Sequence, residues 1–452
     1  MNLQVTEVAK ALNFELISDN TINRVSIDSR DVDKNTLFFA IKGERFDGHD
    51  FIDDVAKKGV GAIVSHKALQ CSAPLILVED TKKAFLDFAS YYRQSFSDLV
   101  VVGLTGSVGK TTTKEMTACV MARKCKTLKT EGNLNNEIGM PKTIFRLDET
   151  YKCGVIEMGM DNAGQISQLS KSCKPDCAII TNIGVSHIES LGSRDSILKA
   201  KLEILDGMKK GSTVFMNGDN DKLQTVENKD FNIVFFGIEN QNCHIIAKDI
   251  KEIDLTTEFV AVKGDIEQKI TIPTVGIHNV YDALAAFAVG LEYGIQPSEI
   301  AKGLLDYAPS GMRQRIKKIG EITVIEDCYN ASPDSQKAGL NSLCKIAKGR
   351  KIAVLGDMLE LGSYSETAHR NVGEYAAECK IDMLFTFGDK SKYMADSAKK
   401  AGLEMVLSFT DKQLLVDELS KTLQAEDTVL FKASRGMKLE EVFEGLYKLW
   451  EV

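Results

Sequence analysis

The sequence is poor in several residue types that mark special classes of protein: among its 452 residues are 7 prolines, one tryptophan and only 7% aromatic residues. It has no low-complexity or collagen-like segment, so a disordered or fibrous chain is excluded. It also lacks an excess of positive charge, because 56 Lys and Arg stand against 64 Asp and Glu and give a net charge of −8. A nucleic acid is therefore not an expected partner.

No apolar run is long enough to span a membrane. The longest, such as LVVVGL from Leu99, are strand-sized, whereas a bilayer needs about 20 residues. The first residues, MNLQVTEVAKALNF, lack the basic and apolar regions of a secretory signal, so we expect a cytoplasmic protein. The 10 cysteines are scattered, and the one close pair, Cys173 and Cys177, has no second pair or nearby His to complete a zinc site.

Short apolar runs that end in Gly, Asn or Asp alternate with helical patterns after residue 99, which is typical of βαβ units on a parallel sheet. A second such series begins near Gly311, and before Leu99 strand-like and helical segments are mixed. The pattern predicts an α/β protein of three domains. They are a small mixed α/β domain at 1–97, a central parallel-sheet domain at 98–309 and a Rossmann-like domain at 310–452.

The strongest motif is the segment TGSVGKTTT, which follows the run LVVVGL and precedes a helical pattern. Gly106 and Gly109 allow backbone N–H groups to turn toward phosphate oxygens, and the start of the helix adds positive potential. Lys110 is placed to contact the β- and γ-phosphates, and the hydroxyl of Thr111 to bind Mg²⁺. The central domain is therefore predicted to be a P-loop domain that holds a nucleoside triphosphate.

Three residues further along allow two interpretations each. Glu157 follows the run CGVIEM and either binds Mg²⁺ at the carboxyl edge of the sheet or is a solvated residue at the end of a strand. His187 lies in a predicted loop, where a lone histidine is more often ordinary than a ligand. Lys201 shares a predicted helix with Lys199, which favours a solvated helix face.

Several segments that occur in one order nevertheless resemble the Mur ligases of peptidoglycan synthesis. They are TGSVGKTTTKEM, TEGNLNNEIGMPKT, EMGMDNAGQI, TNIGVSHIESLGS, KAKLEIL, GIHNVYDALAA, EDCYNASPDS, VLGDMLELG and KASRGMKLE. Within that family the chain is most similar to the member that joins D-alanyl-D-alanine to UDP-N-acetylmuramoyl-tripeptide. The resemblance implies an ATP-dependent carboxylate-amine ligase that forms an acyl phosphate and releases ADP and phosphate, and we expect a monomer.

The resemblance also implies roles for individual residues. Glu157 and His187 match magnesium ligands of the family, and Lys201 matches a lysine that the family carries as an N-carbamate, an anionic oxygen ligand for Mg²⁺. The nucleotide-binding set comprises Gly106, Gly109, Lys110, Thr111, Thr112, Asn279, Asp282, Asn330 and Asp357. The catalytic set comprises Lys110, His187, Lys201 and Arg313, and the set for the UDP-sugar comprises Ser29, Arg30, Asn133, Asn135 and Asn136.

Local structure offers a second explanation for some of these residues. Asn279 can cap the helix that follows, with Asp282 in its first turn, where the family pattern has Asn. Ser332, before Pro333, has the pattern of a helix N-cap. The segments that contain Ser29 and Asn133 also favour turns. At the end of the run TVLFKASR, Ser434 and Arg435 are expected to bind the dipeptide carboxylate, although a surface arginine fits equally well.

Two other functions stay open from the sequence. One is a related ligase that adds a single amino acid, such as the diaminopimelate-adding enzyme or a folylpolyglutamate synthetase. The sequence lacks the Asp-Asn-Pro-Arg segment by which the diaminopimelate-adding relatives recognise their amino acid. The other is a P-loop regulatory NTPase, which would need neither the segment EDCYNASPDS nor the segment LGDMLELG.

Overall fold

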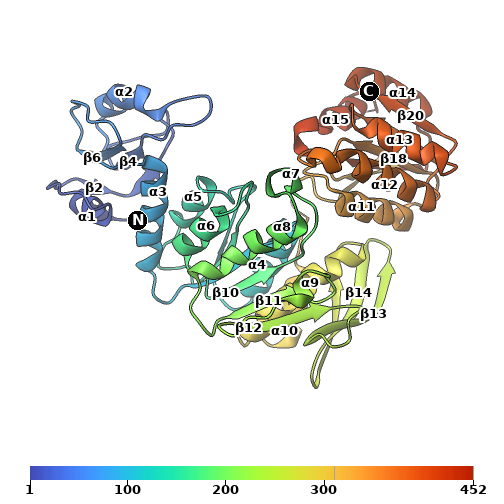
Figure 1. Ribbon diagram of the computed structural model, residues 1–452, viewed down its shortest axis with the longest axis horizontal. Helices are drawn as coiled ribbons and strands as arrows, with labels where there is room; N and C mark the ends of the chain where they lie inside the picture. The colour runs from blue at the N-terminus through green and yellow to red at the C-terminus, as the bar shows by residue number, and fades with distance from the viewer. Residues whose placement is uncertain (310, 451–452) are drawn as a thin grey trace.

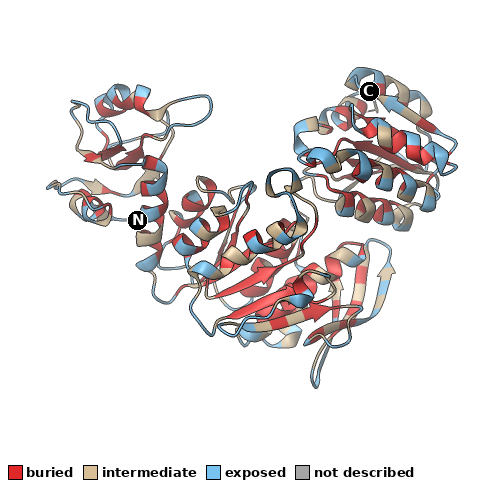
Figure 2. Ribbon diagram, viewed as in Figure 1, coloured by how far each residue is buried: buried red, intermediate tan, exposed pale blue. Residues whose placement is uncertain are grey.

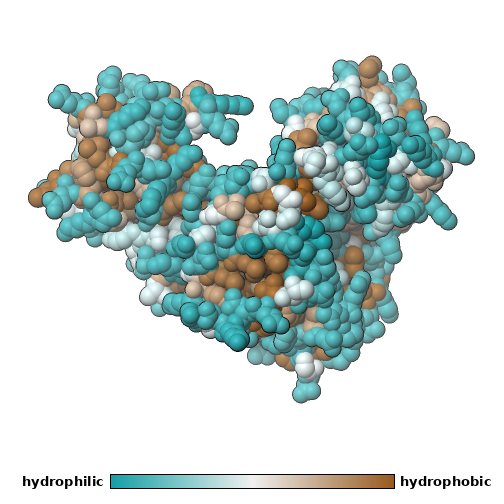
Figure 3. All heavy atoms as spheres, in the orientation of Figure 1, coloured by the Kyte–Doolittle hydropathy of each residue, from teal (hydrophilic) through white to brown (hydrophobic). Residues whose placement is uncertain are grey.

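The computed structural model describes residues 1–309 and 311–450 and shows three α/β domains that follow one another along the chain (Figure 1). The N- and C-terminal domains stand on the same side of the central domain, with an open space between them that is also visible in the space-filling view (Figure 3). Residue 310, where the C-terminal domain is predicted to begin, and residues 451–452 lie outside the described residues. The domain limits near 97 and 309 stay a prediction.

The N-terminal domain is built on a parallel sheet with the strand order β3-β4-β5-β6. Its elements are β1 (Leu3–Gln4), α1 (Val5–Ala11), β2 (Thr21–Ile22), β3 (Arg24–Ser26), β4 (Thr36–Phe39), α2 (Ile52–Lys57), β5 (Ala62–Ser65), β6 (Leu75–Leu77) and α3 (Thr81–Gln94). Helix α3 begins where Asp80 caps it, since the Asp80 side chain accepts hydrogen bonds from the N–H groups of Lys82 and Lys83. Phe39 packs edge to face against Phe85 of α3, which fixes the helix on the sheet.

The central domain contains one large sheet with the order β15-β14-β13-β12-β11-β10-β7-β9-β8. Its strands are β7 (Val100–Thr105), β8 (Thr127–Lys129), β9 (Cys153–Glu157), β10 (Cys177–Ile180), β11 (Thr213–Asn217), β12 (Asn232–Gly237), β13 (Ile245–Ile253), β14 (Thr256–Lys263) and β15 (Ile266–Ile272). Strands β7 to β12 are parallel, which confirms the predicted βαβ units. Strand β13 pairs in parallel with β12 and antiparallel with β14, which in turn pairs antiparallel with β15; this extension of the sheet was not predicted.

Helices cover both faces of this sheet because its central strands are mainly apolar and almost entirely buried (Figure 2). They are α4 (Lys110–Ala122), α5 (Gly139–Ile144), α6 (Gln165–Cys173), α7 (Ile188–Leu191), α8 (Arg194–Leu202), α9 (Ile277–Glu292) and α10 (Pro297–Leu305). One hydrophobic cluster joins the sheet to α4, α9 and α10, and a second joins it to α3, α5, α6 and α8. Helix α4 packs closely on α9, and near the starts of the two helices the Thr113 hydroxyl of α4 donates a hydrogen bond to Asp282 of α9.

The C-terminal domain has a sheet with the order β16-β17-β21-β18-β19-β20, in which all strands but β16 are parallel. Its elements are β16 (Arg315–Ile319), β17 (Ile322–Glu326), α11 (Pro333–Ile346), β18 (Lys351–Gly356), α12 (Ser365–Glu378), β19 (Met383–Phe387), α13 (Ser391–Lys400), β20 (Val406–Phe409), α14 (Lys412–Thr422), β21 (Thr428–Lys432) and α15 (Glu440–Trp450). The Rossmann-like architecture predicted for this domain is confirmed.

The outer surface is mainly hydrophilic in the face that Figure 3 shows, with smaller apolar patches over the central domain. Throughout residues 1–309 and 311–450, no helix combines the length and the apolar composition needed to cross a bilayer.

Candidate nucleotide and metal site

The loop between β7 and α4 has a backbone that only glycine fits at two positions. Gly106 has a φ of +151°, and a Cβ added there would lie 1.9 Å from the Thr181 Oγ1 atom. Gly109 has a φ of +84°, and an added Cβ would lie 2.7 Å from Asp282 Oδ1. Side chains at these positions would therefore collide with the ends of β10 and α9.

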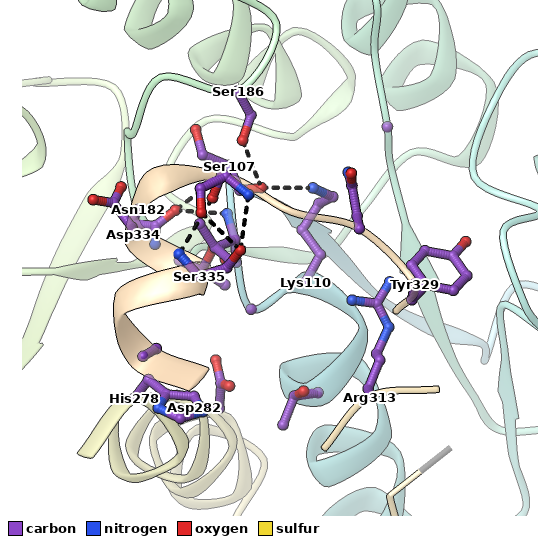
Figure 4. Close-up of a pocket in the computed structure, with 18 of the residues that line it drawn as sticks. Ser107, Lys110, Asn182, Ser186, His278, Asp282, Arg313, Tyr329, Asp334 and Ser335 are labelled. Atoms are coloured by element: carbon purple, nitrogen blue, oxygen red, sulfur yellow. Dashed lines mark hydrogen bonds between the residues drawn. The ribbon is translucent and has the colours of Figure 1, made fainter. Parts of the chain in front are cut away.

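Several hydrogen-bond donors gather in this loop (Figure 4). The backbone N–H groups of Ser107 and Val108 both donate to Asn182 Oδ1, at 3.1 and 2.9 Å. The Nζ of Lys110 folds back over the loop and donates to the carbonyl oxygens of Gly106 and Ser107 at 2.8 and 3.2 Å. Such a cluster of N–H groups and an ammonium at the start of a helix is the arrangement that binds phosphate. Asn182 was not among the predicted site residues.

Oxygen donors suited to Mg²⁺ lie beside the loop. The register of β9 against β7 pairs Glu157 with Leu104, next to the P-loop. Glu157 Oε2 accepts a hydrogen bond of 3.0 Å from the Thr111 hydroxyl, and its Oε1 accepts one of 2.8 Å from the Asn135 amide. Glu157 is only 2% exposed, so its interpretation as a solvated residue is wrong.

This donor set fits a magnesium ion that arrives with a nucleotide. Within the described residues, no three His, Cys, Asp or Glu side chains gather into a cage for a metal. Mg²⁺ in nucleotide sites is commonly bound by one or two carboxylates or hydroxyls together with the phosphates and water. A carboxylate beside a hydroxyl, as in Glu157 and Thr111, is such a set.

Lys201 lies in α8 with 1% of its surface exposed, and its Nζ has no hydrogen-bond partner. Burial first, and then the nearby Lys110 ammonium, lower the pKa of Lys201 well below its usual value. Lys199, two residues earlier, is exposed. The solvated-face interpretation therefore holds for Lys199 and is wrong for Lys201. A buried amine that has no hydrogen-bond partner and a lowered pKa fits the carbamate that the resemblance implies at this position, because the unprotonated amine is the form that reacts with CO₂.

His187 lies immediately before α7 with a φ of +63°. Its Nδ1 is 2.9 Å from Oε2 of Glu360, which belongs to the C-terminal domain, and 3.8 Å from Oδ1 of Asp161. His187 is therefore positioned where the central and C-terminal domains meet.

Helix α9 begins at Ile277 after Gly276, so Asn279 and Asp282 lie inside the helix and the capping interpretation of both is wrong. The Asn279 amide donates to Gln314 Oε1, at 2.9 Å, in the segment that leads into the C-terminal domain. Asp282 Oδ1 accepts a hydrogen bond of 2.6 Å from the Thr113 hydroxyl. Burial raises the pKa of the Asp282 carboxyl to about 7.

The C-terminal domain contributes a second wall. The Arg313 guanidinium lies over the Tyr329 ring, 3.9 Å from its centroid, and both residues are labelled in Figure 4. Ser332 caps α11, with Pro333 in its first turn, as the sequence predicts. In the same wall the Nζ of Lys432, at the end of β21, lies 2.7 Å from Oδ2 of Asp327. Neither residue was among the predicted site residues, although both stand at the carboxyl ends of neighbouring strands.

A cavity of about 420 Å³ lies between the two domains. Many predicted site residues line it, and the structure thus brings together Gly109, Lys110, Thr112, Asn133, Asn135, Asn136, Glu157, His187, Asn279, Asp282, Arg313 and Asn330. Gly106 and Thr111 belong to the same loop and helix start. Asn182, Asp327, Tyr329 and Lys432 line the cavity as well.

Other predicted residues lie outside this cavity. The Asp357 carboxylate accepts hydrogen bonds from the backbone N–H groups of Lys390 and Ser391 at the start of α13, so it stabilises that helix. Ser434 is buried, and its hydroxyl accepts a hydrogen bond from the N–H of Leu359. Lys201 is not among the residues that line the cavity either. The remaining three side chains, Ser29, Arg30 and Arg435, are on the surfaces of the terminal domains, where Arg30 pairs with Asp28 and Arg435 with Glu440.

The sequence matches family profiles over most of its length: the Mur ligase middle domain at residues 104–290, the Mur ligase glutamate ligase domain at 312–435 and the Mur ligase family catalytic domain at 21–93. It is 39% identical to the UDP-N-acetylmuramoyl-tripeptide--D-alanyl-D-alanine ligase of Bacillus subtilis, over 94% of this chain and 93% of the relative.

Two solved structures have the same fold over nearly the whole chain. The crystal structure of MurF from Acinetobacter baumannii superposes with a TM-score of 0.92 at 29% identity and covers 99% of both chains. The structure of MurF ligase from Thermotoga maritima in complex with ADP superposes with a TM-score of 0.86 at 28% identity, over 95% of this chain and 98% of that chain.

Proposed function

The chain belongs to the Mur ligase family, and from that membership we propose that it is an ATP-dependent ligase that joins D-alanyl-D-alanine to UDP-N-acetylmuramoyl-tripeptide for peptidoglycan synthesis. The observation that carries the proposal is the cavity in which the P-loop of the central domain faces Arg313 and Asn330 of the other wall. A ligase of this kind needs a nucleotide and a carboxylate held together, and a cavity between two domains supplies such a place.

In the proposed reaction the terminal carboxylate of the tripeptide attacks the γ-phosphorus of ATP, which gives an acyl phosphate and ADP. The amine of D-alanyl-D-alanine then attacks the activated carbonyl, and loss of phosphate leaves the new amide. Lys110 and Arg313 are the cations placed to reduce the repulsion between the anionic groups. Thr111, Glu157 and His187 are proposed to hold magnesium, which when bound adds further positive charge at the phosphates.

Lys201 is proposed to act as an N-carbamate. Its neutral amine would add to CO₂ to form a C–N bond and release one proton. The product is a carbamate, in which the buried nitrogen, which has no partner of its own, carries a carboxylate group. That carboxylate would supply a hard oxygen ligand close to Lys110. The isolated, buried Nζ supports this assignment because an ammonium there would have no counter-charge bonded to it.

The substrate sites complete the proposal. Asn133, Asn135 and Asn136 line the cavity and are proposed, with Ser29 and Arg30 of the N-terminal domain, to bind the UDP-sugar. Ser434 and Arg435 remain the proposed site for the dipeptide carboxylate. Asp357 is proposed to support the nucleotide side from its place at α13. A cytoplasmic location and a monomeric state belong to the same proposal.

A panel of amines tests this assignment against a ligase for single amino acids. The protein is incubated with ATP, MgCl₂ and UDP-N-acetylmuramoyl-tripeptide, and each amine is offered in turn while the product is identified by mass spectrometry. We expect product with D-alanyl-D-alanine and at least tenfold less with single amino acids such as lysine, diaminopimelate or glutamate. Equal rates with a single amino acid would contradict the substrate proposed here.

A further inference from the structure

Lys114 is a completely buried lysine in α4, one turn after Lys110. Its exposed fraction is 0%, and its Nζ has no hydrogen-bond partner in the described residues. A lysine is almost never buried in this way unless opposite charges lie nearby. Nothing in the proposed reaction uses it.

Two carboxylates flank the Lys114 ammonium as ion-pair partners, although neither has the geometry of a hydrogen bond. Its Nζ lies 3.1 Å from Oε1 of Glu115 and 3.9 Å from Oε2 of Glu157. The other carboxylate oxygen of Glu115 pairs with the ammonium of Lys129, which is partly exposed. Charges thus alternate from the protein surface to the proposed metal ligand, in the order Lys129, Glu115, Lys114 and Glu157.

Glu157 keeps its orientation through neutral groups. Its two oxygens accept hydrogen bonds from Thr111 and Asn135, and within the described residues Lys114 is the one cation within 4.0 Å of the carboxylate. The hydrogen bonds fix where the carboxylate points, and the ammonium supplies the charge that a buried carboxylate requires.

We propose that Lys114 is the built-in counter-ion of the metal-free site, a positioning residue that stabilises Glu157 before a divalent cation binds and lowers the affinity for that cation. The inference rests on the proposed role of Glu157 as a magnesium ligand. A divalent cation beside Glu157 and the Lys114 ammonium are both attracted to one carboxylate and repel each other, and this repulsion is strong where water is excluded. The cation is therefore retained mainly through the phosphates of the nucleotide with which it arrives.

The test measures the melting temperature of the full chain with ADP over a series of MgCl₂ concentrations. Lys114→Met alone leaves the buried Glu157 carboxylate without its ammonium and leaves Glu115 with only the partly exposed Lys129, so it is expected to unfold more easily. The double variant Lys114→Met/Glu115→Gln removes one charge of each sign and so preserves the buried charge balance. For the double variant we expect a half-saturating MgCl₂ concentration at least threefold lower than for the unchanged protein, because it removes the one ammonium that lies within 4.0 Å of Glu157 in the described residues.

Glu115→Gln alone is a control that should shift the half-saturating MgCl₂ concentration in the opposite direction. It leaves the Lys114 ammonium without its nearer partner, so we expect a higher half-saturating MgCl₂ concentration. If Lys114 had only a structural role, its replacement would lower the melting temperature by the same amount at all MgCl₂ concentrations. An unchanged or higher half-saturating concentration in the double variant would overturn the inference.

The unchanged protein separates this inference from the proposed function. If its melting temperature with ADP does not respond to MgCl₂, the metal site and the role of Lys114 are both wrong. The ligase activity is measured separately, by product formed from the two substrates, and its loss or presence does not depend on the response of the Lys114 variants.

Discussion

His187 of the central domain and Glu360 of the C-terminal domain contact each other where the two domains meet, with the Nδ1 and Oε2 atoms 2.9 Å apart. Both residues have a left-handed backbone, with φ values of +63° and +62°. The carbonyl of Glu360 also accepts a weak hydrogen bond of 3.4 Å from the N–H of Glu189. A residue proposed to bind metal is thus held by the opposite domain.

Replacing Glu360 tests whether this contact holds the domains together. The hydrogen bond to His187 lowers the pKa of the Glu360 carboxyl, so the pair adds stability above the unfolded carboxyl value of about 4.3 and loses it as the pH falls through the lowered value. Because Glu360 is largely exposed, Glu360→Gln should cost at most ~1 kcal/mol of unfolding free energy.

Small-angle scattering at pH 7 measures how far the domains separate, and we expect a larger radius of gyration for Glu360→Gln than for the unchanged protein. Glu366→Gln, which breaks an ion pair within α12, is the control, and equal scattering from both variants would contradict the account.

The raised pKa of Asp282 predicts a pH-dependent stability. Between its usual value of 3.8 and about 7, the folded protein keeps a proton that the unfolded chain releases, so the unfolding free energy falls as pH rises through this window. Asp282→Asn removes this titration. Relative to the unchanged protein, the variant should gain about 2 to 3 kcal/mol between pH 5 and pH 8.

Urea unfolding at four pH values from 5 to 8 measures this difference, with the exposed Asp396→Asn of α13 as the control. If the unfolding free energies of Asp282→Asn and of the unchanged protein change with pH in parallel, the buried carboxyl does not titrate in this range. The same variant tests adenine binding by calorimetry. The titration is made at pH 8, above the raised pKa of Asp282. There the ionised carboxylate only accepts hydrogen bonds whereas Asn can donate and accept, so we expect ATP to bind Asp282→Asn several-fold more tightly.

Gly109→Ala should disable the P-loop. The added Cβ would lie 2.7 Å from Asp282 Oδ1 at a φ of +84°, so the loop must move away from α9. We expect at least tenfold weaker ADP binding by calorimetry. Gly211→Ala is a matched control, because Gly211 also has a φ of +84° but nothing lies within 4 Å of an added Cβ. It should cost about 1 kcal/mol of stability and leave ADP binding unchanged. Unaltered ADP affinity in Gly109→Ala would contradict the role given to the loop.

Lys201→Ala should abolish most activity while Lys199→Ala has little effect, because only Lys201 is buried beside the P-loop. Small carboxylates such as acetate are expected to restore part of the activity by replacing the carbamate oxygens. A carbon NMR spectrum in labelled bicarbonate gives an independent measurement, since a carbamate signal should appear in the unchanged protein and disappear in Lys201→Ala. Similar spectra and rates for the two variants would contradict a carbamate at Lys201.

The sequence predicted the parallel strands because they are buried on both faces and read as continuous apolar runs. Strands β13 and β14 were missed because each has one half-exposed face and mixes charged with apolar residues, which gives no such run. The order of the three domains followed from these runs and from the family motifs.

The P-loop was predictable because phosphate binding needs glycine and lysine at fixed spacing within one short segment. The contacts of Lys114 with Glu157, and of Lys432 with Asp327, join residues 43 and 105 positions apart, so they depend on the packing of the sheet rather than on a local pattern. Asp357 shows the opposite case. Its segment matches the family, but its carboxylate is directed to the backbone of α13.

Release of phosphate from ATP, measured while each substrate is omitted in turn, separates a ligase from a regulatory NTPase. We expect rapid release only when UDP-N-acetylmuramoyl-tripeptide and D-alanyl-D-alanine are both present, because the carboxylate must attack the γ-phosphorus and the amine must then displace phosphate from the acyl phosphate. Lys110→Ala should abolish this release. ATP hydrolysis that continues at the same rate without both substrates would contradict the ligase and favour a regulatory NTPase.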